Sequence, residues 1–179
     1  MWPDLTHASL ASMQTIVVDA KKRSAGVLVM SGQRVLLLER GPEVRNAGLW
    51  DLPGGQQNRT ESGYATAARE AVEELFELPE HRIVGAIAVQ RGARRYEIFA
   101  CRVRKRIRKT WAPTLDAEHT AFHWASLDWC RARLAGLHPV VRTLIEHEDG
   151  RRWLAQMLAT RARSYPGGQR STDGFIPPR

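Results

Sequence analysis

Much of the chain alternates short apolar runs with turn residues, a pattern typical of β-strands. Five strands are predicted, over residues 26–30, 35–38, 83–89, 96–103 and 121–125. Ser31, Gly32 and Gln33 separate the first two runs and Gly92 lies between the next two, so each pair is expected to form a hairpin. Ser126 follows the last strand and can cap a helix after it.

Two segments repeat apolar residues at helical spacing. Residues 62–78 are rich in Ala, Glu and Leu, begin with a serine that can cap a helix and stop before Pro79. The second segment covers about residues 138–163 and is expected to be interrupted at Asp149–Gly150. Strands and helices follow one another in mixed order, which predicts an α/β fold with helices on the faces of a central mixed sheet.

The helix predicted over residues 62–78 has an acidic side and an apolar side. At about 100° per residue, one sector collects four acids, which are Glu70, Glu73, Glu74 and Glu77. The residues on the nearly opposite, apolar side are Tyr64, Ala68, Ala71, Val72 and Leu75. Like charges at this spacing repel, so the acidic side is easiest to explain if it binds cations such as Mg²⁺ or Mn²⁺. The alternative is an acidic surface that contacts only water.

A glycine-rich turn leads into this helix. Residues 48–55 read Gly-Leu-Trp-Asp-Leu-Pro-Gly-Gly, and such a turn lets the backbone approach a ligand or metal closely. Turn and helix place one glycine, one arginine and four acids at fixed intervals, and these are Gly55, Glu61, Arg69, Glu70, Glu73 and Glu74. This spacing resembles the Nudix box, the signature of the Nudix hydrolase family.

The chain departs from the family pattern where a glycine and an aliphatic residue are replaced by Phe76 and Glu77. We expect Phe76 to stay helical for most of another turn, because a left-handed helix exit strains a residue that carries a side chain. Leu78 then takes the aliphatic position and Pro79 ends the helix. Glu77 is either a functional carboxylate of the acidic side or a solvated residue next to it.

The resemblance implies the α/β/α Nudix sandwich with a central mixed sheet over about residues 24–147. The helical segment that follows extends this single predicted domain over residues 1–163, and residues 164–179 are expected to be a flexible basic tail. A chain of 179 residues with 43% hydrophobic residues suits one such core.

The resemblance also implies roles for the box residues. The expected metal ligands, in order of expectation, are Glu73, Glu74, Glu70 and the Gly55 carbonyl. Arg69 is expected to orient carboxylates by pairing with Glu73 or with Glu61, which lies behind the ligands. Bound metal neutralises diphosphate oxygens and lowers the pKa of a coordinated water, which favours hydrolysis.

The general base is open between alternatives, because the family takes it from the box helix in some members and from a distant loop acid in others. Glu118 lies in a predicted loop before the last strand, from which it could reach the metals. If Glu118 is only a solvated loop residue, Glu70 or Glu73 takes this role. Arg40 and Arg45, near the start of the box, are candidate phosphate contacts.

The chain is strongly basic, with a formal net charge of +8. Between Arg91 and Lys109 lie nine Lys or Arg residues and one acid, Glu97. In a phosphohydrolase this field would draw polyphosphates toward the site. The rival interpretations are contacts with nucleic-acid phosphates and a genome with high arginine usage. Trp111 follows the basic run and could stack on a base, although packing is its expected role.

Cellular location and redox state follow from what the sequence contains. No apolar run approaches the roughly 20 residues of a membrane span and no signal peptide is recognisable, so a cytoplasmic protein without a membrane partner is expected. Cys101 is predicted in a strand and Cys130 in a helix, both as reduced thiols.

The sequence therefore predicts a Mg²⁺-dependent pyrophosphohydrolase, with Mn²⁺ as an alternative metal, that cleaves a nucleoside diphosphate linked to another moiety. Two alternatives stay open. Phe76 at the glycine position motivates a catalytically weak nucleotide-binding sensor, and the basic residues motivate a hydrolase of RNA 5′ ends. The expected partner is a small-molecule nucleotide, with RNA and a homodimer as further options.

Overall fold

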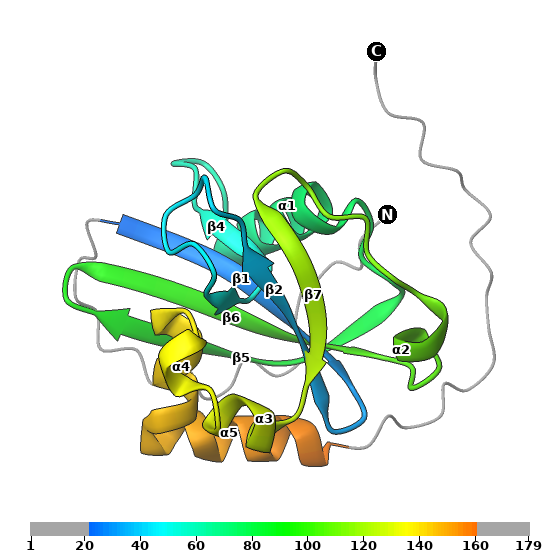
Figure 1. Cartoon of the computed structure of the whole chain (residues 1–179). Helices are drawn as coiled ribbons and strands as arrows, with labels where there is room; N and C mark the ends of the chain where they lie inside the picture. Colours follow the sequence, from blue (N-terminus) through cyan, green and yellow to red (C-terminus); the bar gives the residue numbers. More distant parts are fainter. Residues whose placement is uncertain (1–21, 161–179) are drawn as a thin grey trace.

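A mixed seven-stranded sheet forms the centre of the computed structural model, which describes residues 22–160 (Figure 1). Its strands are β1 (Lys22–Ser31), β2 (Arg34–Arg40), β3 (Trp50–Asp51), β4 (Gly54–Gln56), β5 (His81–Arg91), β6 (Arg94–Val103) and β7 (His119–Ala125). β1 lies inside the sheet, parallel to β6 and antiparallel to β2 and β4. β2 also pairs with β3 and β7, and β6 also pairs with β5, so the predicted mixed sheet is confirmed.

Both predicted hairpins form. β1 and β2 are antiparallel around Gly32, which has a φ of 63°, and β5 and β6 are antiparallel around Gly92, which has a φ of 57°. Glycine suits both turns because a left-handed φ strains residues with a β-carbon. The predicted cap after β7 is also present, since the Ser126 hydroxyl accepts a hydrogen bond from Trp129 N at 3.1 Å.

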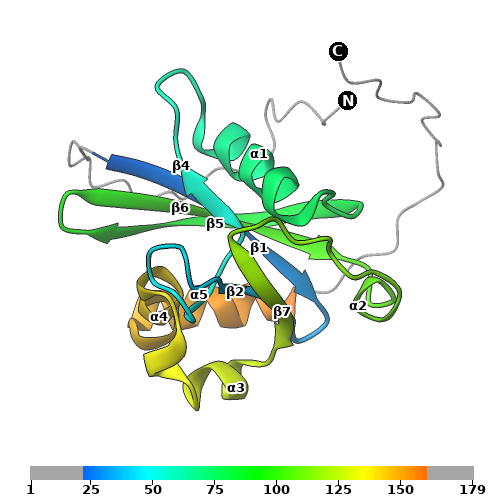
Figure 2. The same ribbon diagram turned by 45° about the horizontal axis from the view of Figure 1, so that its top comes forward.

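The two faces of the sheet carry separate hydrophobic cores. The helices are α1 (Gly63–Leu75), α2 (Ile107–Thr110), α3 (Leu127–Arg131), the 3-10 helix η1 (Leu134–Gly136), α4 (Pro139–Glu146) and α5 (Glu148–Ala159). Neighbouring strand residues point to opposite faces, so Val27 and Val29 pack with α1 while Leu28 and Met30 pack with α4 and α5. Figure 2 shows α1 on one side of the sheet and α3, α4 and α5 on the other. This arrangement confirms the predicted α/β/α sandwich.

The C-terminal helical segment breaks earlier than predicted. His147 alone separates α4 from α5, and Asp149 and Gly150 lie inside the first turn of α5. The predicted break at Asp149–Gly150 is wrong because this glycine serves close packing. A β-carbon on Gly150 would lie 2.6 Å from the Leu144 carbonyl oxygen, so a residue without a side chain lets α5 approach α4 this closely.

The buried side of α1 differs from the predicted one. Glu74 is only 6% exposed and lies on the buried side of the helix together with Ala67, Ala71 and Leu75. Val72, which was expected to face the core, is 41% exposed. The buried sector is shifted because α1 packs against the β4 turn as well as against β1, and Glu74 faces that turn.

Phe76 ends α1, contrary to the expectation that it stays helical. The helix stops at Leu75, and Phe76 has a φ of 65° and a ψ of −36°. The chain makes this turn although Phe76 carries a side chain, and such backbone strain costs roughly 1–3 kcal/mol. The Phe76 ring is 74% exposed. Glu77 lies apart from the other acids, since its carboxylate accepts a hydrogen bond from Trp111 Nε1 at 2.9 Å.

Residues 1–21 and 161–179 lie outside the described residues, as does the tail predicted over residues 164–179. Cys101 in β6 and Cys130 in α3 are buried free thiols, in the elements predicted for them. Burial raises the pKa of the Cys101 thiol to about 12. Within residues 22–160, no helix combines the length and apolar character that crossing a membrane requires.

Candidate active site

The acids of α1 meet the glycine turn at β4. Ser62 caps the helix by accepting a hydrogen bond from Ala65 N at 3.1 Å, which fixes where α1 begins. A β-carbon on Gly55 would lie 2.4 Å from the carboxyl carbon of Glu70. The backbone of the turn therefore lies directly against a carboxylate, because glycine has no side chain to keep it away.

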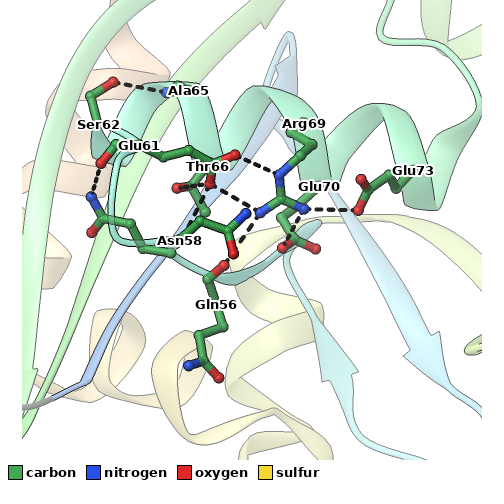
Figure 3. Close-up of polar contacts among 10 residues, drawn as sticks. Gln56, Asn58, Glu61, Ser62, Ala65, Thr66, Arg69, Glu70 and Glu73 are labelled. Carbon is green, nitrogen blue, oxygen red and sulfur yellow. Dashed lines mark hydrogen bonds and ion pairs between the residues drawn. The ribbon is translucent and has the colours of Figure 1, made fainter.

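Arg69 connects the acids of the box to one another (Figure 3). Its Nε donates to Glu61 Oε1 at 2.9 Å, and its Nη1 lies 2.9 Å from both Glu70 Oε1 and Glu73 Oε2. Nη2 also donates to the Gln56 carbonyl at 3.3 Å. The hydrogen bond from Arg69 lowers the pKa of Glu61 to about 2, so Glu61 is ionised at neutral pH. Arg69 thus pairs with both acids proposed for it from the sequence.

Glu74 is a buried carboxyl group at the same turn. It accepts a hydrogen bond from Gly54 N at 3.0 Å. Burial raises its pKa to about 9 against the effect of this hydrogen bond, and the negative charges of Asp51, Asp116 and Glu70 add to the increase. The negative charges of these neighbours therefore act on one buried carboxyl group, whose ionised form a positive charge would stabilise.

Two of these acids, Asp51 and Asp116, were not predicted as site residues. Asp51 is 4% exposed; it accepts a hydrogen bond from Leu52 N at 2.7 Å and lies 3.2 Å from His138 Nδ1. Asp116 lies 2.8 Å from His119 Nδ1, and its backbone N donates to the Glu74 carbonyl at 3.3 Å. An acid inside the apolar run Leu-Trp-Asp-Leu was the sequence signal for Asp51, whereas Asp116 had no comparable signal.

Arg40 lies between two acids of this region. Its guanidinium is 3.7 Å from Asp51 and 3.8 Å from Glu118, and its Nε donates to the Arg45 carbonyl at 2.8 Å. The structure therefore brings Arg40 and Glu118 together beside the acids. Arg45 contributes its backbone to this group, while its exposed side chain has no ion pair with any residue in the range 22–160.

The donor set suits a hard divalent cation, although the acids are not gathered around one point. Within residues 22–160, no three side chains of Asp, Glu, His or Cys converge closely enough to hold a metal ion. Arg69 draws Glu70 and Glu73 to itself and Gly54 holds Glu74, which accounts for their separation. The chemistry still fits, because carboxylates are the ligands that Mg²⁺ and Mn²⁺ prefer and Gly55 carries no side chain between its backbone and Glu70.

Comparison with known proteins identifies the family. Residues 20–147 match the model of the NUDIX domain, so the chain belongs to the Nudix family. This confirms the predicted Nudix hydrolase, an enzyme that acts on phosphoric anhydride bonds. No curated protein sequence matches the chain.

Solved structures share the fold at low sequence identity. The MutT protein from Methanosarcina mazei Go1 has 24% identity and a TM-score of 0.56 over 78% of this chain and 96% of its own. The Nudix hydrolase RenU from M. smegmatis has 18% identity and a TM-score of 0.62 over 79% and 89%. A C. elegans Ap4A hydrolase has 17% identity and a TM-score of 0.55 over 75% and 98%.

Proposed function

We propose that this protein is a pyrophosphohydrolase, dependent on Mg²⁺ or Mn²⁺, that cleaves a nucleoside diphosphate linked to another moiety. The observation that carries the proposal is the placement of Glu70 and Glu74 against the Gly54–Gly55 turn, with Glu73 joined to Glu70 through Arg69. Family membership supports the reaction class. The name of the C. elegans neighbour, an Ap4A hydrolase, supports a nucleotide derivative as the substrate class.

Four groups would hold the metal, and they are Glu73, Glu74, Glu70 and the Gly55 carbonyl. Bound there, a divalent metal neutralises phosphate oxygens and lowers the pKa of water. Two observations support this ligand set. The high pKa of Glu74 marks a position where positive charge would favour the ionised carboxylate, and the backbone of Gly55 lies directly against the carboxylate of Glu70.

Arg69 and Glu61 are proposed as positioning residues. Arg69 contacts Glu61 through both Nε and Nη2, at 2.9 and 3.2 Å, so it would stay anchored if Glu73 left it to hold a metal. Thr66 Oγ1 donates to Glu61 at 2.9 Å and fixes that carboxylate in turn. The pair therefore sets the orientation of the carboxylates without touching the substrate.

We propose that Glu118 is the general base that accepts the proton of the attacking water. Glu70 or Glu73 is the alternative. Glu118 is 57% exposed, and its contact with Arg40 is a loose one at 3.8 Å, so the carboxylate can change position. Arg40 and Arg45 are proposed as phosphate contacts. The exposed guanidinium of Arg45 favours it for this role, whereas Arg40 would first have to leave its acidic partners.

We also propose the domain organisation and the cellular compartment of the protein. One sheet and two shared cores join the described elements, which supports a single domain over residues 1–163. Two buried free thiols in that part of the chain suit a reducing compartment, which supports the cytoplasm.

The experiment is a substrate panel with each metal, followed by variants. Nucleoside triphosphates, nucleotide sugars, dinucleoside polyphosphates and capped RNA would be tested for phosphate-containing products. We expect Glu73→Gln and Glu74→Gln to lower turnover by roughly 100-fold or more. Glu77→Gln is the matched control, because Glu77 lies on the same segment and bonds to Trp111. Full turnover in both site variants would contradict the ligand assignment.

A further inference from the structure

The segment 104–109, which we call the basic turn, carries charge that the proposed reaction does not use. Its five cations are all exposed, and they are Arg104, Lys105, Arg106, Arg108 and Lys109. Within residues 22–160, their one acidic contact is Glu80, at 3.5 Å from Arg104. Like charges in consecutive positions repel, so an anion that binds here gains affinity by relieving that repulsion.

The basic turn is held in a fixed conformation. Ile107 packs into the core beneath α1, and the Arg106 carbonyl accepts hydrogen bonds from Lys109 N at 2.8 Å and Thr110 N at 3.1 Å. Figure 1 shows α2, whose first three residues belong to the basic turn, at the edge of the molecule, away from α3, α4 and α5. Its cations are therefore presented to solvent by a preorganised backbone, which lowers the entropy lost on binding.

An exposed aromatic ring lies on the adjoining segment. Phe76 is 74% exposed, and the residue after it, Glu77, bonds to Trp111 just beyond the basic turn. Four residues after Phe76, Glu80 contacts Arg104 at the other end of the turn. The chain from Phe76 to Glu80 thus runs beside the basic turn, which places the exposed Phe76 and the cations on neighbouring segments.

We propose that Phe76 and the basic turn bind single-stranded nucleic acid. A single strand offers phosphates to the cations and unpaired bases to the ring, and both features are needed to use this surface fully. Inorganic polyphosphate would use only the cations. A lipid surface is less suitable, because Phe76 and Val72 are the only exposed large hydrophobic residues in the described part of the chain. This binding goes beyond the proposed hydrolysis and does not depend on it.

The test is fluorescence anisotropy of the full-length protein with a short labelled RNA single strand. The RNA carries a 5′-hydroxyl and the buffer contains EDTA, so hydrolysis plays no part. We expect the double variant Arg106→Glu/Arg108→Glu to raise Kd about 10-fold and to reduce the slope of log K against log salt by about 1.4. Phe76→Ala should raise Kd about 5-fold or more through loss of stacking.

The matched control reverses two other exposed arginines. Arg91→Glu/Arg94→Glu makes the same change in net charge at the opposite end of β6, and we expect less than a 2-fold change in Kd. Equal losses in the two double variants, or no binding by the unaltered protein, would overturn the proposal. Polyphosphate that competes as well as RNA, with Phe76→Ala unaltered, would also overturn it in favour of simple anion binding. Thermal unfolding of each variant verifies that it is folded.

Discussion

The carboxyl group of Glu70 occupies the space that a side chain on Gly55 would need, since a β-carbon there would lie 2.4 Å from the carboxyl carbon. Because the obstructing atoms are the end of a flexible side chain, a residue larger than glycine would displace Glu70 and leave the fold in place. A substitution at position 55 can therefore test the position of Glu70 without unfolding the protein.

We therefore expect Gly55→Ala to lower metal affinity and turnover about 10-fold or more while the melting temperature changes little. Metal titration monitored by activity and by calorimetry measures the effect. Gly136→Ala is the control, because a β-carbon on Gly136 meets no atom within 4 Å. Unchanged metal affinity in Gly55→Ala would show that the position of Glu70 does not matter.

Arg69 should not be replaceable by lysine. A lysine has a single ammonium group and cannot reach Glu61, Glu70 and Glu73 together, so we expect Arg69→Lys to lower turnover roughly 10- to 100-fold. Arg152→Lys provides a comparison, because Arg152 also pairs with two acids of its own helix, Glu148 and Asp149, but on α5. Steady-state kinetics should show a loss of turnover in Arg69→Lys and none in Arg152→Lys.

The buried carboxyl of Glu74 predicts how stability depends on pH. Its pKa rises from 4.5 to about 9 on folding, so between these values the folded state binds more protons than the unfolded state. Stability of the metal-free protein should therefore fall as pH rises from about 4.5 to 9. Urea unfolding at a series of pH values in EDTA measures this slope.

Glu74→Gln should flatten this slope and stabilise the metal-free protein at pH 7 by about 2 kcal/mol, because the amide is neutral and can still accept from Gly54 N. The same variant is expected to lose turnover, so stability and activity would move in opposite directions. Glu73→Gln, at an exposed position of the same helix, should leave the slope as it is. A destabilised Glu74→Gln protein would mean that the carboxylate is charged and satisfied by its neighbours.

Phe76→Gly should stabilise the protein relative to Phe76→Ala. Both variants remove the ring, but only glycine tolerates a φ of 65° without strain, so the difference isolates the backbone term. We expect the glycine variant to be more stable by about 1 kcal/mol, or roughly 2–4 °C in Tm. Equal melting temperatures would indicate that the alanine variant relaxes to a different helix end.

The parts of the fold that were predicted correctly depend mostly on short sequence signals. Glycines at Gly32 and Gly92 marked both hairpins, and the serine caps at Ser62 and Ser126 marked the starts of two helices. These features depend on a few neighbouring residues, so they can be recognised without knowing the rest of the structure. The spacing from Gly55 onward likewise marked the box, and the family match covers it.

The predictions that were wrong concern residues whose surroundings come from the packing of one element on another. The sequence predicts a helix break at Gly150, whereas this glycine lies inside α5 and lets that helix pack closely against Leu144 of α4. The burial of Glu74 depends on Gly54, twenty residues earlier, which a helical wheel alone does not include. Asp116 enters the site through a loop whose path no local pattern indicates. Phe76 shows the reverse case, in which the overall fold imposes a turn that the residue itself disfavours.

The pairing of β1 also has a consequence for the order of folding. One edge of β1 bonds to β4 at Gly26, and the other bonds in parallel to β6, where Gly26 lies beside Ile98. The whole box lies within the chain that this parallel pairing must close, and contacts between such distant residues form slowly. During refolding from denaturant, α1 should regain its helical signal early, whereas catalytic competence should return only with the slowest phase, when β6 docks on β1.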